Sequence, residues 1–309
     1  MAKIIDVGSY VVDLTSRTPH FPKPGETVFA GPFSMGHGGK GSNQAVAAAR
    51  LGASVTMVTK VGKDLFGDHA LEHFRKENIR DDYVLRDEHE STGAALIGID
   101  DTGENMIIVA PGACGTMTEE DVYRAEREFQ KVDMVLTQLE TSMEAVEATV
   151  ELARTFAKPI VLNPAPFQPV SDRLLKHITY ITPNETEAEQ LTGVQVVDEE
   201  SARMAARILV EKGVTTVIIT LGKRGCYVYD SEKGGRLIQG CSINVCDTTG
   251  AGDAFTGAFT TYVADGLAID EAAYRANMVA ALSVTRQGTA KSMPTTAELE
   301  AFMAKMSQE

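Results

Sequence analysis

The stretch "CDTTGAGDAFTGAF" at residues 246–259 places Asp253 directly after Gly250, Ala251 and Gly252, where an apolar helical run begins. A glycine-rich turn that leads into a helix points free backbone N–H groups and a partial positive charge outward, which suits an anion such as phosphate. A carboxylate at the mouth of such a cradle needs its own explanation. One interpretation makes Asp253 the N-cap of the helix.

On both sides of this stretch, short β-branched runs alternate with helical patterns. The strand candidates are residues 4–8, 54–62, 133–139, 159–166, 177–183 and 215–222, and the helix candidates are 42–52, 64–78, 143–156 and 199–213. Continuous apolar strands that alternate with helices predict an α/β fold, with a Rossmann-like, mostly parallel central sheet and helices on both faces. We expect a single domain over residues 1–309, with ligands at the carboxyl ends of the strands.

Two segments depart from this alternation. Residues 92–110 are two strand-like runs around a "DDTGEN" turn, with no helix between them. Residues 26–36 are also strand-like and precede a glycine cluster. Together they predict a small accessory β-sheet from roughly residues 13–37 and 92–112, suited to a lid, a dimer surface or both. Residues 226–230, 236–240 and 242–247 predict a β-meander.

Composition narrows the class of partner and the compartment. The chain has 309 residues, 43% of them hydrophobic and 23% charged, and its net charge is −14. Nucleic acids and anionic membranes require basic surfaces, so we expect neither as a partner. The apolar runs are shorter than the roughly 20 residues that span a bilayer, and no signal-peptide pattern opens the chain. The four cysteines lack metal-ligand spacing, which favours reduced thiols and a cytoplasmic location.

A second glycine cluster, "GHGGKGSNQ", occupies residues 36–44. Gly36, Gly38 and Gly41 match the dinucleotide fingerprint G-x-G-x-x-G, which on its own points weakly to a Rossmann oxidoreductase. A plain tight loop capped by Ser42 is another interpretation. We favour a loop whose backbone N–H groups approach a polyhydroxylated ligand around Lys40.

Three shorter motifs each have a structural alternative. "TPNETEAEQL" at 182–191 pairs Asn184 with Glu187 in a capping-box spacing, although it also follows a strand end where ligands bind. "TLGKRG" at 220–225 fits either a hairpin connection or a ligand turn. His69 and His73 fit H-x-x-E-H, but without a third ligand a solvated helix face is the preferred interpretation over zinc.

The motifs together resemble the ribokinase-like family of sugar kinases over essentially the whole chain. "GGKGSNQAVAAARLGA" looks like the first family signature and "DTTGAGDAFTGAF" the second, with "NPAP", "TPNETEAEQLTG" and "TLGKRG" between them in the expected order. The resemblance implies an ATP-dependent phosphotransferase of carbohydrate metabolism. Such an enzyme would act on the hydroxyl of a small sugar, with D-ribose, converted to ribose 5-phosphate, as the leading candidate.

The resemblance also implies roles for individual residues. Asp253 would be the catalytic base, with the N–H groups of Gly250, Ala251 and Gly252 as an anion hole, which fits the positioning chemistry of phosphoryl transfer. The implied sugar-binding residues are Val11, Asp13, Gly39, Lys40, Gly41, Ser42, Asn43, Glu140 and Asp253. The implied nucleotide-binding residues are Asn184, Glu187, Thr220, Leu221, Gly222, Lys223, Arg224, Gly225, Gly252 and Asn277. Glu187 would act through Mg²⁺. The positions matching a monovalent-cation (K⁺) site are Asp247, Thr249, Ser283, Arg286, Gly288 and Ser292.

One departure from the family pattern concerns the sugar. Ribokinases usually have Asn-x-Asp after the first strand, whereas this chain has Val11 and Asp13. A sugar hydroxyl that faces Val11 loses a partner, which leaves 2-deoxyribose, fructose or a nucleoside as alternative substrates. A non-catalytic sugar- or nucleotide-binding regulator is the alternative of a different class. The resemblance also implies a homodimer formed through the lid.

Overall fold

The computed structural model describes residues 1–306, and its largest sheet has nine strands in the order β13-β12-β11-β10-β9-β8-β1-β4-β5. Neighbouring strands from β5 to β11 pair in parallel, and only the β11–β12–β13 end is antiparallel. The strands are β1 (Lys3–Val7), β4 (Ser54–Gly62), β5 (Arg80–Asp87), β8 (Met134–Gln138), β9 (Ile160–Asn163), β10 (Tyr180–Ile181), β11 (Thr216–Thr220), β12 (Gly225–Asp230) and β13 (Gly234–Gln239). The predicted α/β fold with a mostly parallel sheet is confirmed.

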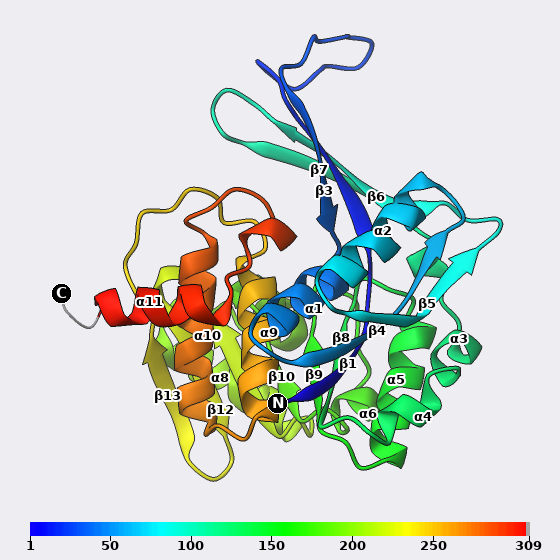
Figure 1. Cartoon of the computed structure of the whole chain (residues 1–309). Helices are drawn as coiled ribbons and strands as arrows, with labels where there is room; N and C mark the ends of the chain where they lie inside the picture. Colours follow the sequence, from blue (N-terminus) through cyan, green and yellow to red (C-terminus); the bar gives the residue numbers. More distant parts are fainter. Residues whose placement is uncertain (307–309) are drawn as a thin grey trace.

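Helices cover both faces of this sheet (Figure 1). One face carries α1 (Lys40–Arg50), α2 (Leu65–Lys76), α9 (Ala251–Ala264), α10 (Ile269–Ser283) and α11 (Thr296–Met306); the other carries α3 (Glu119–Tyr123), α4 (Glu126–Phe129), α5 (Met143–Thr155), α6 (Asp172–Leu175), α7 (Glu185–Thr192) and α8 (Glu199–Glu211). Side chains alternate along a strand, so neighbours Ile4 and Ile5 of β1 enter different cores. Among residues 1–306, no helix combines the length and apolar character needed to cross a membrane.

A second sheet of four strands projects from this body (Figure 1). Its order is β3-β2-β6-β7, with β2 (Val11–Arg17), β3 (Phe33–Gly38), β6 (Thr92–Ile99) and β7 (Asn105–Gly112). The predicted small sheet is therefore present. The strand predicted at 26–36 is shorter than expected: β3 begins only at Phe33, directly after Pro32, which cannot donate to a strand ladder.

The predicted third strand of the β-meander, residues 242–247, is wrong. The backbone N–H groups of Cys246 and Asp247 both donate to the carbonyl oxygen of Val284, at 2.8 and 3.1 Å. The chain therefore leaves β13 and runs to the end of α10 before it enters α9. This route places the glycine-rich turn at 247–250 against the loop that follows α10.

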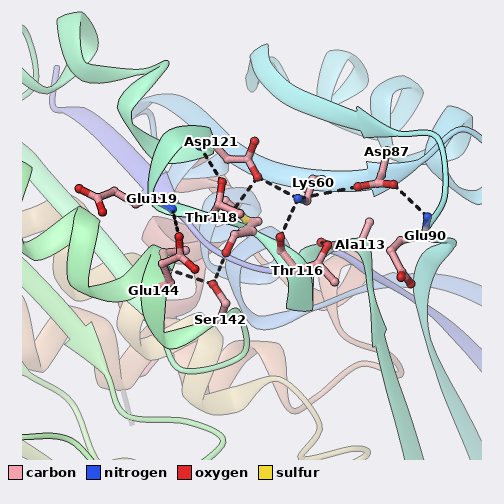
Figure 2. A network of polar contacts seen from close by, with 12 residues as sticks. Lys60, Asp87, Glu90, Ala113, Thr116, Thr118, Glu119, Asp121, Ser142 and Glu144 are labelled. Atoms are coloured by element: carbon pink, nitrogen blue, oxygen red, sulfur yellow. Dashed lines mark hydrogen bonds and ion pairs between the residues drawn. The ribbon is translucent and has the colours of Figure 1, made fainter.

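A polar cluster around Lys60 ties the base of the small sheet to the large one (Figure 2). Lys60 on β4 donates to the Asp121 carboxylate at 2.8 Å and to the Thr116 carbonyl at 2.7 Å, in the segment that leaves β7. Asp87, which ends β5 just before β6, lies 3.8 Å from the same ammonium group. Because Lys60 is mostly buried, this cluster holds two of the connections between the sheets in place, the one from β5 to β6 and the one that leaves β7.

Candidate active site

Asp253 lies in the first turn of α9 and is buried. The N-cap of α9 is Gly250, whose φ of 79° is a left-handed conformation that favours glycine, and no side chain caps the helix. The interpretation of Asp253 as an N-cap is therefore wrong. The Asp253 carboxylate makes no capping hydrogen bond to the N-terminus of α9.

The Asp253 carboxylate is held by two amide groups from α1. Asn43 Nδ2 donates to Asp253 Oδ2 at 2.9 Å, and Gln44 Nε2 donates to Oδ1 at 2.9 Å. The two helices approach closely because α9 has a glycine at 257, where a Cβ would lie 2.5 Å from the Gln44 carbonyl oxygen. Both carboxylate oxygens are thus fixed in orientation, which suits a base that must meet a hydroxyl at a defined angle.

Behind Gln44 runs a chain of buried amides that sequence reasoning did not anticipate. Gln44 Nε2 also donates to Asn163 Oδ1 at 3.0 Å. Gln138 Nε2 donates to Gln44 Oε1 at 2.9 Å and to Asp6 Oδ1 at 3.0 Å. Burial raises the pKa of Asp6 well above its ordinary value, a change that its Gln138 hydrogen bond opposes and the charge of Asp253 reinforces. The only sequence feature that could have indicated this hydrogen-bond network is that Gln44 and Asn163 stand inside the motifs "GGKGSNQ" and "NPAP".

The second glycine cluster, residues 36–44, runs from the end of β3 into the start of α1 and carries Lys40 into the site. The N-cap is Gly39, with a φ of 88°, so the interpretation of Ser42 as a cap is wrong. The Lys40 N–H donates to Glu140 Oε2 at 2.8 Å. Burial lowers the pKa of Lys40, but the negative charges of Asp253, Glu140 and Glu187 outweigh burial and raise it.

Asp13 and Val11 lie two residues apart on β2, so they share one face of the small sheet. Burial raises the pKa of Asp13 to about 6; a Thr289 hydrogen bond lowers it, and the charges of Glu140 and Asp253 raise it further. These three carboxylates and Lys40 therefore gather between the small sheet and the start of α9. Gly36 and Gly38 belong to β3 of the small sheet, so the dinucleotide-fingerprint interpretation lacks its required core strand.

Two adjoining cavities meet at the start of α9. A polar cavity of 170 Å³ is lined by Lys40, Asn163, Ala165, Thr182, Asn184, Glu187, Thr220, Thr248, Gly250, Ala251, Gly252 and Asp253. A more apolar cavity of 310 Å³ shares Thr220, Thr248, Ala251 and Gly252 with it. Its other lining residues include Gly222, Lys223, Gly225, Val245, Phe255, Asn277 and Ala280. The arrangement fits a ligand with a flat apolar end and a charged end directed toward Asp253.

Two residues of the 220–225 segment lie outside both cavities. Leu221 is buried in the core between the large sheet and the helices α3 to α8. Arg224 donates to the Val197 carbonyl at 2.8 Å and pairs with Glu185 at 3.3 Å. Both side chains therefore support the turn from outside the two cavities.

Asn184 and Glu187 form the predicted capping box of α7. Each side chain accepts from the other residue's backbone N–H, at 2.8 and 2.9 Å. Both also line the polar cavity. Burial raises the pKa of Glu187, although the Asn184 N–H and the charge of Lys40 oppose this change. The structural and ligand-binding interpretations of this motif are therefore compatible.

The residues implied for a monovalent cation come from two segments that lie side by side. The Gly288 N–H donates to Asp247 Oδ2 at 2.9 Å, and the Asp247 N–H donates to the Val284 carbonyl at 3.1 Å. The guanidinium of Arg286 pairs with Glu298 at 2.8 Å. The structure therefore brings the segments around Asp247 and Gly288 together, and the monovalent-cation site stays a prediction.

His73 does not lie on a solvated face, contrary to the sequence-based preference. It is buried, and its ring stacks on that of His37 with centroids 3.8 Å apart. Burial and the neighbouring His37 lower the pKa of His73 to about 3. Within residues 1–306, no group of three or more His, Cys, Asp and Glu side chains is placed to hold a metal ion.

Comparison with known proteins identifies the family. The model of the pfkB family carbohydrate kinases matches residues 1–296. The chain belongs to the pfkB family of carbohydrate kinases. The predicted resemblance and the predicted class of enzyme, an ATP-dependent carbohydrate kinase, are confirmed, so the interpretations as an oxidoreductase and as a non-catalytic regulator are not retained.

Individual members of the pfkB family are similar to this chain in sequence and in structure over almost its whole length. A ribokinase from Haemophilus influenzae is 43% identical, covering 98% of this chain and 99% of its own. A deoxyribokinase from Salmonella typhi is 36% identical, covering 96% and 97%. The structure of Arabidopsis thaliana ribokinase complexed with ribose and ATP superposes with a TM-score of 0.89 at 27% identity, covering 98% of each chain.

Proposed function

We propose that this sugar kinase phosphorylates a pentose, with D-ribose converted to ribose 5-phosphate as the leading reaction. The observation that carries the proposal is the Asp253 carboxylate, held by Asn43 and Gln44 at the mouth of the anion-binding turn. The 43% identical ribokinase supports ribose as the sugar.

In the proposed reaction, Asp253 accepts the proton of the sugar O5 hydroxyl as that oxygen bonds to the γ-phosphorus of ATP. The bond from the γ-phosphorus to the β–γ bridging oxygen breaks, and ADP leaves. N–H groups of Gly250 and Gly252 stabilise the charge on the transferring group, as donors at a helix N-terminus do. The Ala251 N–H, which the family resemblance also implies as a donor, is directed in this structure to the Thr248 carbonyl at 3.2 Å. Lys40 lines the same polar cavity and adds a positive charge there.

The two adjoining cavities divide the nucleotide between them. The apolar cavity, which Asn277 and Phe255 line, suits the adenine and ribose of ATP, and the polar cavity suits its phosphates. Glu187 lines the phosphate side and would hold Mg²⁺ through water, which neutralises phosphate charge when bound. A K⁺ ion would bind the carbonyl oxygens of the Asp247 and Gly288 segments.

The test is ADP release from Mg²⁺-ATP in the presence of K⁺, against ribose, 2-deoxyribose, fructose and adenosine. We expect a pentose to give the highest kcat/KM. A preference for fructose or adenosine would overturn the pentose proposal and leave the kinase fold standing. Measuring the reaction with the preferred sugar in the absence of K⁺ tests the cation proposal separately, and we expect a lower rate.

A second candidate sugar is 2-deoxyribose. Val11 presents an apolar side chain on the same face of β2 as Asp13, and so offers no hydrogen bond to a sugar hydroxyl. The 36% identical deoxyribokinase supports this candidate. The two pentoses are therefore compared directly in the panel.

Sugar use should depend on the ionisation of Asp13. Burial raises the pKa of this carboxyl from 3.8 to about 6, and it must be ionised to accept sugar hydroxyls. We therefore expect kcat/KM for the sugar to fall as pH drops through about 6, because this constant reports the enzyme before the sugar binds. The measurement is kcat/KM at saturating ATP between about pH 5 and pH 8, with circular dichroism as a control for folding. A value that stays flat down to pH 5 contradicts this assignment.

We also propose that the four-stranded sheet is a lid over the sugar and the contact surface of a homodimer. Four consecutive apolar residues of β7, Met106 to Val109, are exposed, so neither face of this edge strand is covered. Such an edge invites pairing with a second copy.

Substitution Ile108→Asp should convert this dimer to a monomer, because Ile108 is 59% exposed at the centre of the strand. Light scattering coupled to size-exclusion chromatography measures the mass. Met204→Asp is the matched control, since Met204 is 49% exposed on α8, which packs on β11 and β12 of the large sheet. A wild-type monomer at micromolar concentration contradicts the proposal.

A further inference from the structure

The hydroxyl of Thr289 reaches the small sheet from the far end of the chain. Thr289 lies between α10 and the short 3₁₀ turn at Ala290–Ser292. Its Oγ1 donates to Asp13 Oδ2 at 3.0 Å and to the His37 carbonyl oxygen at 2.9 Å. A hydroxyl has one proton, so strands β2 and β3 share it and fix the Thr289 rotamer between them.

The backbone of Thr289 packs on the phosphate side of the site. A Cβ placed on Gly250 would lie 3.4 Å from Thr289 Cα, so the two main chains are in direct contact at the start of α9. The preceding Gly288 donates its N–H to Asp247 at 2.9 Å. One residue therefore touches both the carboxylate on the sugar side and the turn on the phosphate side.

The second oxygen of Asp13 is placed by the glycine segment. A Cβ on Gly38 would lie 2.2 Å from Asp13 Oδ1, so this oxygen rests directly over the backbone that leads to Lys40. With Oδ2 engaged by Thr289, rotation of the carboxylate is restricted and Oδ1 keeps one direction. Glu140 and Asp253 contribute further negative charge nearby, and a hydroxyl donor offsets part of that repulsion.

We propose that Thr289 is a positioning residue for sugar binding, which holds the Asp13 carboxylate in the orientation that accepts a sugar hydroxyl. This inference rests on the proposed sugar-binding role of Asp13. It predicts an effect on sugar affinity without an equal effect on the chemical step, because Asp13 contacts the sugar equally before and during phosphoryl transfer.

The test compares Thr289→Val, which keeps the shape and removes the hydroxyl, with Thr289→Ser, which keeps the hydroxyl. With the preferred pentose, we expect Thr289→Val to raise KM for the sugar on the order of tenfold, the loss typical of a hydrogen bond to a charged group. Values of kcat and KM for ATP should stay within about twofold of wild type. Thr289→Ser should restore KM for the sugar.

Thr285→Val is the matched control. Thr285 lies in the same loop, is exposed, and donates only to the Leu282 carbonyl at 2.7 Å. It should leave every constant unchanged. An unchanged KM for the sugar in Thr289→Val overturns the inference, and so do equal losses in the Val and Ser variants, because they would indicate packing and not the hydroxyl.

Asp13→Asn separates this inference from the proposed site. A raised KM for the sugar in Asp13→Asn together with a normal Thr289→Val would overturn the role of Thr289 alone. An unchanged KM in Asp13→Asn would overturn the sugar-binding role of Asp13 and this inference with it. Raised values in Asp13→Asn and Thr289→Val, with rescue by serine, support both.

Discussion

Replacing Asp253 with asparagine lowers kcat by a factor of about 10²–10⁴, the usual contribution of a positioned general base. Asparagine keeps the size of the side chain and removes its capacity to accept the hydroxyl proton. The loss should therefore appear in kcat, while KM for ATP and for the sugar stays within about threefold of wild type. Steady-state ADP release measures all three constants.

The control for this variant is Asp265→Asn, the same chemical change at the other end of α9. Asp265 is the C-cap residue, and its carboxylate pairs with the amino group of Met1 at 3.3 Å. It should retain full kcat. Circular dichroism and ATP binding report whether Asp253→Asn remains folded. A fall in kcat of less than about tenfold in a folded Asp253→Asn would show that another group takes the proton.

Replacing Val11 with asparagine raises the ratio of kcat/KM for ribose to that for 2-deoxyribose by roughly 5- to 150-fold. This range corresponds to about 1–3 kcal/mol, the cost of leaving a buried polar group without a partner. Val11 is buried next to Gly93, where a Cβ would lie 2.8 Å from Val11 Cγ1. An asparagine at this position offers a donor and an acceptor to a hydroxyl that valine leaves unpaired.

Val11→Ala is the matched control, because it removes bulk without adding an amide. It should alter both sugars alike and leave their ratio unchanged. The measurement is kcat/KM for each sugar at saturating ATP. If Val11→Asn stays active and the ratio does not move, the side chain at position 11 does not choose between the two pentoses.

Local sequence was sufficient to predict the layers and the turns. Continuous apolar strands must be buried on both faces, so their alternation with helices requires a parallel sheet between two helical layers. The turns at Gly39 and Gly250 were predictable because both adopt positive φ angles, which favour glycine. Asp253 could be proposed as the base because it follows such a turn within a long family signature.

The contacts among distant side chains were decided by the tertiary structure alone. Gln44 and Asp253 are 209 residues apart, and Thr289 and Asp13 are 276 apart. Periodicity along a chain reports which face of an element is buried, but not which other element covers that face. For the same reason the sequence pattern predicted an exposed His73, whereas in the structure His37 of β3 stacks on its ring.

The sequence by itself therefore determined the fold class, the carbohydrate-kinase family and the carboxylate at the start of α9, because each depends on residues that are close in the chain. Only the tertiary structure decided how that carboxylate is oriented and which side chains surround the proposed sugar site. The order of strands brings α1, α9 and the small sheet together, and their side chains meet only after this packing has formed.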